Sequence, residues 1–148
     1  MNKLHILLVE DNEGDVILIT ELLQNKPVIS SISVAKNGRL AIDLLEQKEN
    51  LTEKVLPDII LLDINLPIVD GHEVLKYIKT HFHLKHLPVI MLSTSSARKD
   101  IKVAYENHAN CFITKPVDVD EFQHIIDEMT GFWSRIASLP KVITEPSA

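Results

Sequence analysis

The sequence is poor in the features that mark several common classes of protein. A single cysteine, Cys111, rules out an internal disulfide and fits the reducing cytosol. No apolar run approaches the ~20 residues of a membrane-spanning helix. The opening segment, MNKLHILLVED, has too short an apolar stretch, and no small-residue cleavage site, for a signal peptide. These absences argue against a secreted or membrane protein, and we expect a cytoplasmic one.

Positive charge and glycine are also scarce. Lys and Arg number 15 against 21 Asp and Glu, a net charge of −6, so the chain lacks the basic footprint of a nucleic-acid-binding protein. It has four glycines and contains neither G-x-G-x-x-G nor G-x-x-x-x-G-K-[ST], which argues against a nucleotide-binding module. What remains, 148 residues with 45% hydrophobic and 24% charged, is typical of one globular domain.

What the sequence does contain is an alternation of short apolar runs with amphipathic segments. The runs, expected as strands, span 4–9, 32–35, 59–62, 89–92 and 111–113; the segments expected as helices span 14–25, 38–49, 71–81, 97–107 and 118–137. Asp118, with Glu121 three residues later, predicts the start of the last and longest helix. We therefore expect an α/β protein, a doubly wound five-stranded parallel sheet, in a domain spanning 1–138 with a flexible tail at 139–148.

Polar side chains follow four of these predicted strands where each ends. They are Glu10 and Asp11, then Asp63, then Ser93 and Thr94, and finally Lys115 and Pro116. A parallel sheet gathers its carboxyl ends at one edge, where ligands bind in such folds. Three carboxylates in close proximity repel one another, and a hard cation such as Mg²⁺ relieves this.

For such an ion, Asp11 and Asp63 offer carboxylate oxygens, the chain after Asp63 offers the backbone carbonyl of Asn65, and Glu10 can hold a coordinated water. Lys115 and the hydroxyl of Ser93, with Thr94 beside it, would then surround an anion placed on Asp63. A phosphoryl group fits, because a carboxylate can accept one as an acyl phosphate.

Taken singly, these residues have ordinary interpretations. An Asp after a strand is usually a turn or cap residue, a lone Lys is usually solvated, and Ser93 and Thr94 could begin the next helix. The matching chemical types at the ends of several strands favour a site.

With these residues at the ends of its predicted strands, the chain resembles the receiver domains of two-component response regulators, the CheY-like family. The matching segments are VEDNEGD at 9–15, PDIILLDINLPIVDG at 57–71, LPVIMLSTS at 87–95 and CFITKP at 111–116. The resemblance implies a sheet of strand order 2-1-3-4-5 with five helices, of which the C-terminal one is extended. It also implies Mg²⁺-dependent transfer, with Mn²⁺ as a substitute, of a phosphoryl group from a sensor histidine kinase, in a signalling protein that is not an enzyme otherwise.

Position by position, the resemblance assigns each residue a role. Asp63 looks like the phosphoacceptor, Glu10 and Asp11 like the acidic metal pair, Asn65 like the carbonyl ligand, Ser93 and Phe112 like the switch pair, and Lys115 like the phosphoryl-pairing lysine. The Lys115–Pro116 bond resembles one that is cis in this family, although trans is the default from the sequence alone. The sequence has Ser93 where Thr is common, which keeps the hydroxyl and loses a methyl group, and Phe112 where Tyr is common. Thr94 stands where Ala is common, so access to Asp63 should be narrower.

The family resemblance extends to a narrower group. The domain leaves too few residues for an output module, and loop 50–57 with the ending FWSRIASLP resembles single-domain regulators that partner phytochrome-type histidine kinases. Apolar residues recur along the last helix at spacings of three and four, so we expect a homodimer surface formed by Phe122, Met129, Phe132, Trp133 and Ile136. The downstream protein partner is not specified by the sequence.

Two other functions compete with this one. An aspartyl-phosphate hydrolase would use Asp63 as nucleophile, but it needs a second acid two residues later, where Asn65 stands. A receiver-like scaffold without phosphotransfer would not need the complete set of acidic, hydroxyl and lysine residues.

Overall fold

The computed structural model describes residues 3–46 and 56–140. In chain order its elements are β1 (Leu4–Val9), α1 (Glu13–Gln24), β2 (Ile29–Ala35), α2 (Gly38–Glu46), β3 (Ile59–Leu62), α3 (Gly71–Thr80), β4 (Val89–Ser93), α4 (Arg98–Glu106), β5 (Cys111–Thr114), α5 (Val119–Gly131) and a π-helical turn (Phe132–Ile136). Asp118 lies before the last helix as expected, and its side chain accepts from the Asp120 amide; Asn37 lies before α2, and its side chain accepts from the Leu40 amide.

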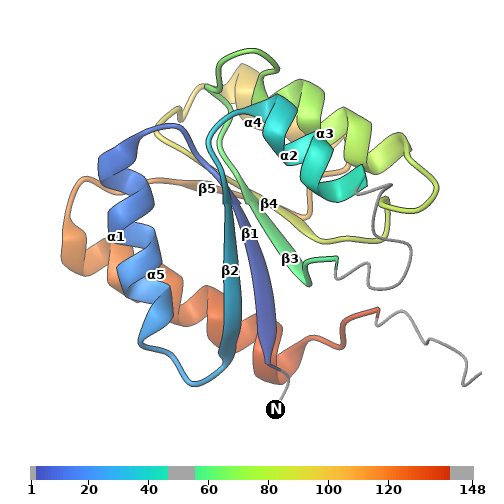
Figure 1. Ribbon diagram of the computed structural model, residues 1–148. Coiled ribbons are helices and arrows are strands. Elements are labelled where there is room, and N and C mark those ends of the chain that lie inside the picture. Colours follow the sequence, from blue (N-terminus) through green and yellow to red (C-terminus); the bar gives the residue numbers. More distant parts are fainter. Residues whose placement is uncertain (1–2, 47–55, 141–148) are drawn as a thin grey trace, which may run out of the picture.

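The five strands form one parallel sheet in the order β2-β1-β3-β4-β5, as the resemblance implied (Figure 1). Val9 pairs with Leu62 in the next strand, and Ser93 pairs with Thr114, so the strands end at nearly the same level. Their carboxyl ends therefore bring the residues that follow them to a common edge.

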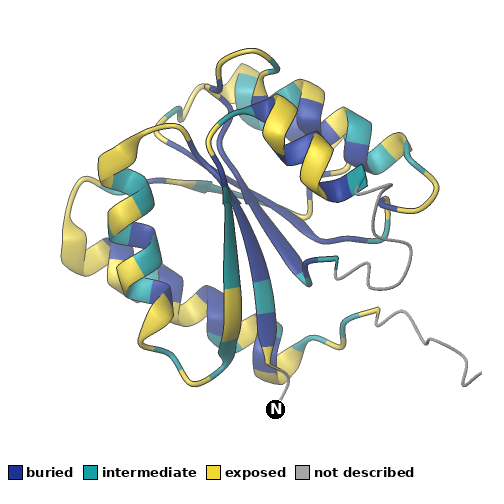
Figure 2. Cartoon of the chain, viewed as in Figure 1, coloured by how far each residue is buried: buried dark blue, intermediate teal, exposed yellow. Residues whose placement is uncertain are grey.

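Helices cover both faces of the sheet. One core cluster packs α1 and α5 against β1, β3 and β4, with Ile19, Leu23, Phe122 and Ile126 among its buried residues. The other packs α2, α3 and α4 on the opposite face. The central strands β1, β3 and β4 are the most deeply buried part of the described chain, whereas the edge strand β2 is partly exposed (Figure 2). Burial on both faces explains why the central strands read as continuous apolar runs.

The last helix differs from the expectation in two ways. The predicted helix over 118–137 is α-helical only to Gly131 and continues as a π-turn. The predicted dimer surface is wrong at Phe122, which is 3% exposed and belongs to the core. Met129, 8% exposed, also packs in the core, and it lines the apolar groove at the end of α5. The spacing of these two residues serves the packing of α5 on the sheet, which uses the same three- and four-residue repeat as a helix–helix seam. Phe132 and Ile136 remain exposed.

Other expectations fall at the edge of the described chain. Leu139, placed by the sequence at the start of a flexible tail, packs against the core beside α5. Residues 141–148, 47–49 of the second predicted helix and 50–55 of the predicted loop lie outside the described residues. In the part of the chain that the structure describes, no helix is long and apolar enough to cross a bilayer.

Candidate phosphoryl-acceptor site

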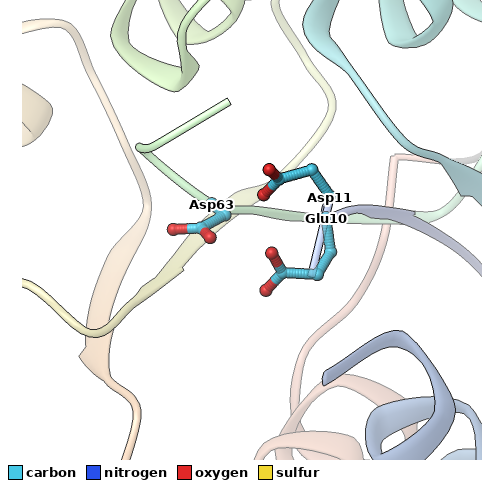
Figure 3. Close-up of side chains that lie close together, drawn as sticks. All are labelled: Glu10, Asp11 and Asp63. Atoms are coloured by element: carbon cyan, nitrogen blue, oxygen red, sulfur yellow. The ribbon is translucent and has the colours of Figure 1, made fainter. Parts of the chain in front are cut away.

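Three carboxylates meet where β1 and β3 end. Glu10 and Asp11 directly follow β1, and Asp63 directly follows β3. Because Val9 and Leu62 are register partners, their successors are neighbours, and the Asp63 amide donates to the Val9 carbonyl at 3.1 Å. One oxygen of each carboxylate lies within 4.8 Å of the others (Figure 3). This is the trio that the strand ends predicted, and its hard oxygen donors fit a Mg²⁺ or Mn²⁺ ion.

The carboxylates differ in burial. Glu10 and Asp63 are buried, whereas Asp11 is exposed. Burial raises the pKa of Glu10 to about 7, and the neighbouring Asp63 charge adds to this while Lys115 opposes it. Lys115 is the cation paired with both Glu10 and Asp63, and a divalent cation would supply the further positive charge that three neighbouring carboxylates need. The Asn65 carbonyl stays a predicted ligand; Asn65 itself lies in the exposed loop after Asp63.

Lys115 is the cation within this acidic group. Its Nζ forms an ion pair with Glu10, lies 2.9 Å from Asp15 Oδ2, and lies 3.4 Å from Asp63 Oδ2. Burial lowers the pKa of Lys115, but the hydrogen bonds to Glu10 and Asp15 and the charge of Asp63 raise it on balance, so the side chain is held as an ammonium. The lysine is thus charged and within reach of the predicted acceptor.

Asp15 is the member of this site that the sequence reading missed. It sits in the first turn of α1, four residues before the buried Ile19 and eight before the buried Leu23. That spacing places it on the buried stripe of the helix, and a carboxylate on such a stripe needs a cation partner. The spacing of Asp15 relative to Ile19 and Leu23 could therefore have identified it from the sequence. In the structure its cation partner is Lys115.

The predicted hydroxyl and switch residues occupy neighbouring strands. Ser93 is fully buried at the end of β4, and its Oγ accepts from the Ser95 amide at 3.3 Å. Thr94 beside it is exposed. Phe112 on β5 is half-buried and packs against the core on the side of α2, α3 and α4, and its amide donates to the Tyr105 hydroxyl. These positions are compatible with the predicted roles of Ser93 and Thr94 in binding the phosphoryl group and of Ser93 and Phe112 as the switch pair. Those roles stay predictions.

Gly71 allows the third helix to begin close to the acceptor. A Cβ at this position would lie 2.0 Å from the backbone carbonyl oxygen of Asp63, so no larger residue fits without movement of the backbone. The Gly71 amide donates to the Ile64 carbonyl at 2.7 Å, and the Ile64 amide donates to Asp63 Oδ1 at 2.7 Å. The acceptor side chain is in this way held by the loop that carries it.

The expected cis bond before Pro116 is not found. All described peptide bonds, Lys115–Pro116 among them, are trans. Trans is the lower-energy form of an X–Pro bond by ~0.5–1 kcal/mol, and Lys115 contacts Glu10, Asp15 and Asp63 with the bond in that form.

Comparison with known proteins agrees with this geometry. The family model described as "Response regulator receiver domain" matches residues 6–127. Response regulator Rcp1 of Synechocystis sp. is 36% identical over 135 residues, which cover 91% of this chain and 92% of Rcp1.

Two solved structures are similar over nearly the whole chain. The phosphorylated cyanobacterial phytochrome response regulator RcpA is 40% identical with a TM-score of 0.88, covering 94% of this chain and 99% of RcpA. The Mn²⁺-bound form of Rcp1 is 35% identical with a TM-score of 0.85, covering 93% of this chain and 99% of Rcp1.

Proposed function

This chain belongs to the family of response regulator receiver domains, and on that premise we propose that Asp63 accepts a phosphoryl group from a sensor histidine kinase. The single observation that carries the proposal is the arrangement at Asp63. Two further carboxylates lie close enough to share an ion with it, and a buried lysine lies 3.4 Å from its oxygen. Such a site can hold both a metal ion and a phosphoryl group on one carboxylate.

The transfer requires little covalent chemistry from the protein. An Asp63 oxygen attacks the phosphorus of a phosphohistidine; the new P–O bond forms as the P–N bond breaks, and the imidazole leaves with the electron pair of that bond. Asp11, Asp63 and the Asn65 carbonyl would hold a Mg²⁺ ion, with Glu10 placed to bind one of its waters, and the ion would supply neutralising charge. Lys115 and the Ser93 hydroxyl would contact the remaining phosphoryl oxygens. The protein catalyses only its own modification.

Signalling would follow from a shift between two conformations. The phosphoryl group carries nearly two negative charges in place of the single charge of the Asp63 carboxylate, and these attract the Lys115 ammonium and the Ser93 hydroxyl. Ser93 must give up its bond from the Ser95 amide to turn toward the phosphoryl group. Its movement would free space for Phe112, which is already half-buried, and would alter the surface formed by α4, β5 and α5. A downstream protein that binds one of these surfaces more tightly would read the signal.

A phytochrome-type kinase is the proposed phosphodonor, acting in the cytoplasm. The support is the likeness, along nearly the full chain, to RcpA, which is a cyanobacterial phytochrome response regulator. The RcpA structure is of a phosphorylated protein, and the Rcp1 structure contains Mn²⁺. Both agree with the chemistry proposed here for Asp63.

Self-association is proposed through the end of α5. An apolar groove of about 520 Å³ lies there, lined by residues that include Cys111, Ile113, Ile125, Phe132 and Trp133. Phe132 and Ile136 are 45% and 74% exposed, so burying them in a dimer would be favourable. Analytical ultracentrifugation should detect a dimer that the substitution Phe132→Asp weakens. A monomer at high concentration, with and without phosphorylation, would contradict the dimer.

The proposed acceptor is tested by intact-mass measurement after incubation with Mg²⁺ and acetyl phosphate. We expect a single labile phosphoryl adduct that requires the metal and disappears in Asp63→Asn. Asp70→Asn is the matched control, because Asp70 caps α3 at the other end of the same loop, its Oδ1 accepting from the Glu73 amide, and asparagine also caps helices. An adduct that persists in Asp63→Asn, or that is lost in both variants, would contradict the assignment.

A further inference from the structure

Lys115 has a partner that the proposed phosphoryl chemistry does not use, the carboxylate of Asp15. The Nζ–Oδ2 distance is 2.9 Å, shorter than the 3.4 Å to the acceptor Asp63. The Lys115 side chain is 4% exposed and that of Asp15 is 29% exposed, so this ion pair is partly shielded from water. A charge-assisted hydrogen bond of this kind is stronger than one on an open surface.

Helix α1 holds the Asp15 carboxylate in this position. The Asp15 amide donates to the side chain of the N-cap residue Asn12 at 2.9 Å, which fixes the first turn. Glu13 in the same turn faces elsewhere and pairs with Lys36 at 2.6 Å on the surface. The two acids of one helical turn therefore have different roles, and only Asp15 contacts the site.

Asp15 lies outside the carboxylate trio. Among the described residues, the trio of acids whose oxygens could share one ion is Glu10, Asp11 and Asp63. An ion bound by that trio would weaken the hold of Glu10 and Asp63 on Lys115, because it competes for the same oxygens and repels the ammonium. Asp15 would then be the carboxylate left to pair with the lysine.

We propose that Asp15 is a positioning residue that competes for Lys115, first with the metal-binding carboxylates and then with the phosphoryl group on Asp63. This inference rests on the proposed function of Asp63. By drawing Lys115 toward α1, Asp15 clears the cation from the metal site and so favours metal binding. After transfer, the same pull weakens the contact between Lys115 and the phosphoryl group, and the acyl phosphate is shorter-lived.

The substitution Asp15→Asn keeps the shape of the side chain and removes its charge. It should change the Mg²⁺ affinity and the lifetime of the acyl phosphate in opposite directions. Titration calorimetry without a phosphodonor should show Mg²⁺ affinity reduced by about threefold, since Lys115 then stays with Glu10 and Asp63. At saturating Mg²⁺, the acyl phosphate should persist about three to ten times longer after the donor is removed. General damage to the fold would not weaken metal binding while prolonging the phosphorylated state.

Two controls tie the effect to the Lys115 contact. Glu13→Gln removes the same charge from the same helical turn and should leave both quantities near their wild-type values. In a Lys115→Gln background, Asp15→Asn should no longer prolong the acyl phosphate, as expected when one residue acts through another.

The outcomes distinguish this inference from the proposed function. An acyl-phosphate lifetime that is unchanged or shortened in Asp15→Asn would overturn the role of Asp15. So would a lifetime prolonged to the same extent by Glu13→Gln, or by Asp15→Asn in the Lys115→Gln background. In each of these cases, wild-type protein that is still labelled leaves Asp63 as the acceptor. Wild-type protein that takes up no phosphoryl group at Asp63 would overturn both.

Discussion

At the scale of single residues, Glu10 is the carboxyl that burial perturbs most clearly. Its pKa is raised from 4.5 to about 7 in the metal-free protein, with burial as the main cause. A carboxyl whose folded-state pKa is raised binds its proton more tightly when folded. Its contribution to stability is therefore complete below about pH 4.5 and is lost as the pH rises through about 7.

In EDTA, the wild-type free energy of unfolding should accordingly fall with pH between about 4.5 and 7, relative to Glu10→Gln. Urea unfolding at a series of pH values measures this difference in slope, which does not depend on the absolute stability of the variant. Glu13→Gln, at an exposed acid of the neighbouring turn, should keep the wild-type slope. Parallel curves for wild type and Glu10→Gln would contradict the raised pKa.

The members of the site that follow strands were predictable, because parallel strands in register bring their ends to one edge. Glu10, Asp11, Asp63 and Lys115 were expected as neighbours on that ground, and the structure brings them together. Asp15 was not expected, since its contact depends on how α1 is rotated about its axis. The positions of the strand ends do not specify that rotation. The helical spacing of Asp15 with the buried Ile19 and Leu23 does specify it.

At the scale of elements, the loop between β3 and α3 contains backbone strain. Ile68 has a φ of 72°, and the Val69 amide donates to the Pro67 carbonyl at 2.9 Å, which makes a γ-turn centred on Ile68. A β-branched residue is disfavoured in this conformation by ~1–2 kcal/mol. The side chain is 77% exposed, so little packing compensates for the strain.

The substitution Ile68→Gly should therefore raise the free energy of unfolding by about 1 kcal/mol, the relief of strain less the greater freedom of glycine in the unfolded chain. Ile68→Ala is the matched control: it also removes the exposed side chain but keeps the Cβ that causes the strain, and should give no comparable gain. Chemical denaturation compares the variants. A loss of stability in Ile68→Gly would show that contacts of this side chain outweigh its backbone cost.

The predicted boundaries of helices and strands were least accurate where backbone hydrogen bonding, and not the hydrophobic pattern, determines them. β2 begins at Ile29, before the apolar run at 32–35, because Ile29 and Ser31 pair with Leu4 and His5 of β1 through the backbone. The apolar stripe of the last helix continues past Gly131, yet the backbone changes to a π-turn closed by the bond from the Ala137 amide to the Phe132 carbonyl. Hydrophobic spacing does not distinguish that geometry from an α-helix.

At the scale of the whole molecule, metal binding should couple to stability. The trio of carboxylates is assembled only when β1 and β3 are paired, so an ion that binds it favours the folded chain. Mg²⁺ at about 100 times its Kd should raise the free energy of unfolding by about 2.7 kcal/mol, and Mn²⁺ should act in the same direction.

Thermal unfolding with increasing Mg²⁺ measures this coupling. The midpoint should rise with metal concentration in the wild type and in Asp70→Asn, whose substitution lies outside the trio. The rise should be much smaller in Asp11→Asn, which replaces a charged carboxylate ligand with a neutral amide. A wild-type thermal unfolding midpoint that does not change with Mg²⁺ concentration would count against a cation site in this protein.

The two helical layers were predictable, because central strands that are apolar on both faces require cover on both sides. The strand order came from the family resemblance and not from the pattern of apolar residues. The surface that α5 presents was not predictable, since the same spacing serves core packing and self-association. Phe122 and Met129 belong to the former.

The most direct test of the central claim is to locate the phosphoryl group itself. Protein incubated with Mg²⁺ and acetyl phosphate is reduced with borohydride, which converts an aspartyl phosphate to homoserine, and is then digested and mapped by mass spectrometry. We expect homoserine at residue 63 and at no other acid, in an amount that falls when the metal is removed. Homoserine at Asp11 or Asp15 instead, or none in folded protein saturated with Mg²⁺, would contradict the account.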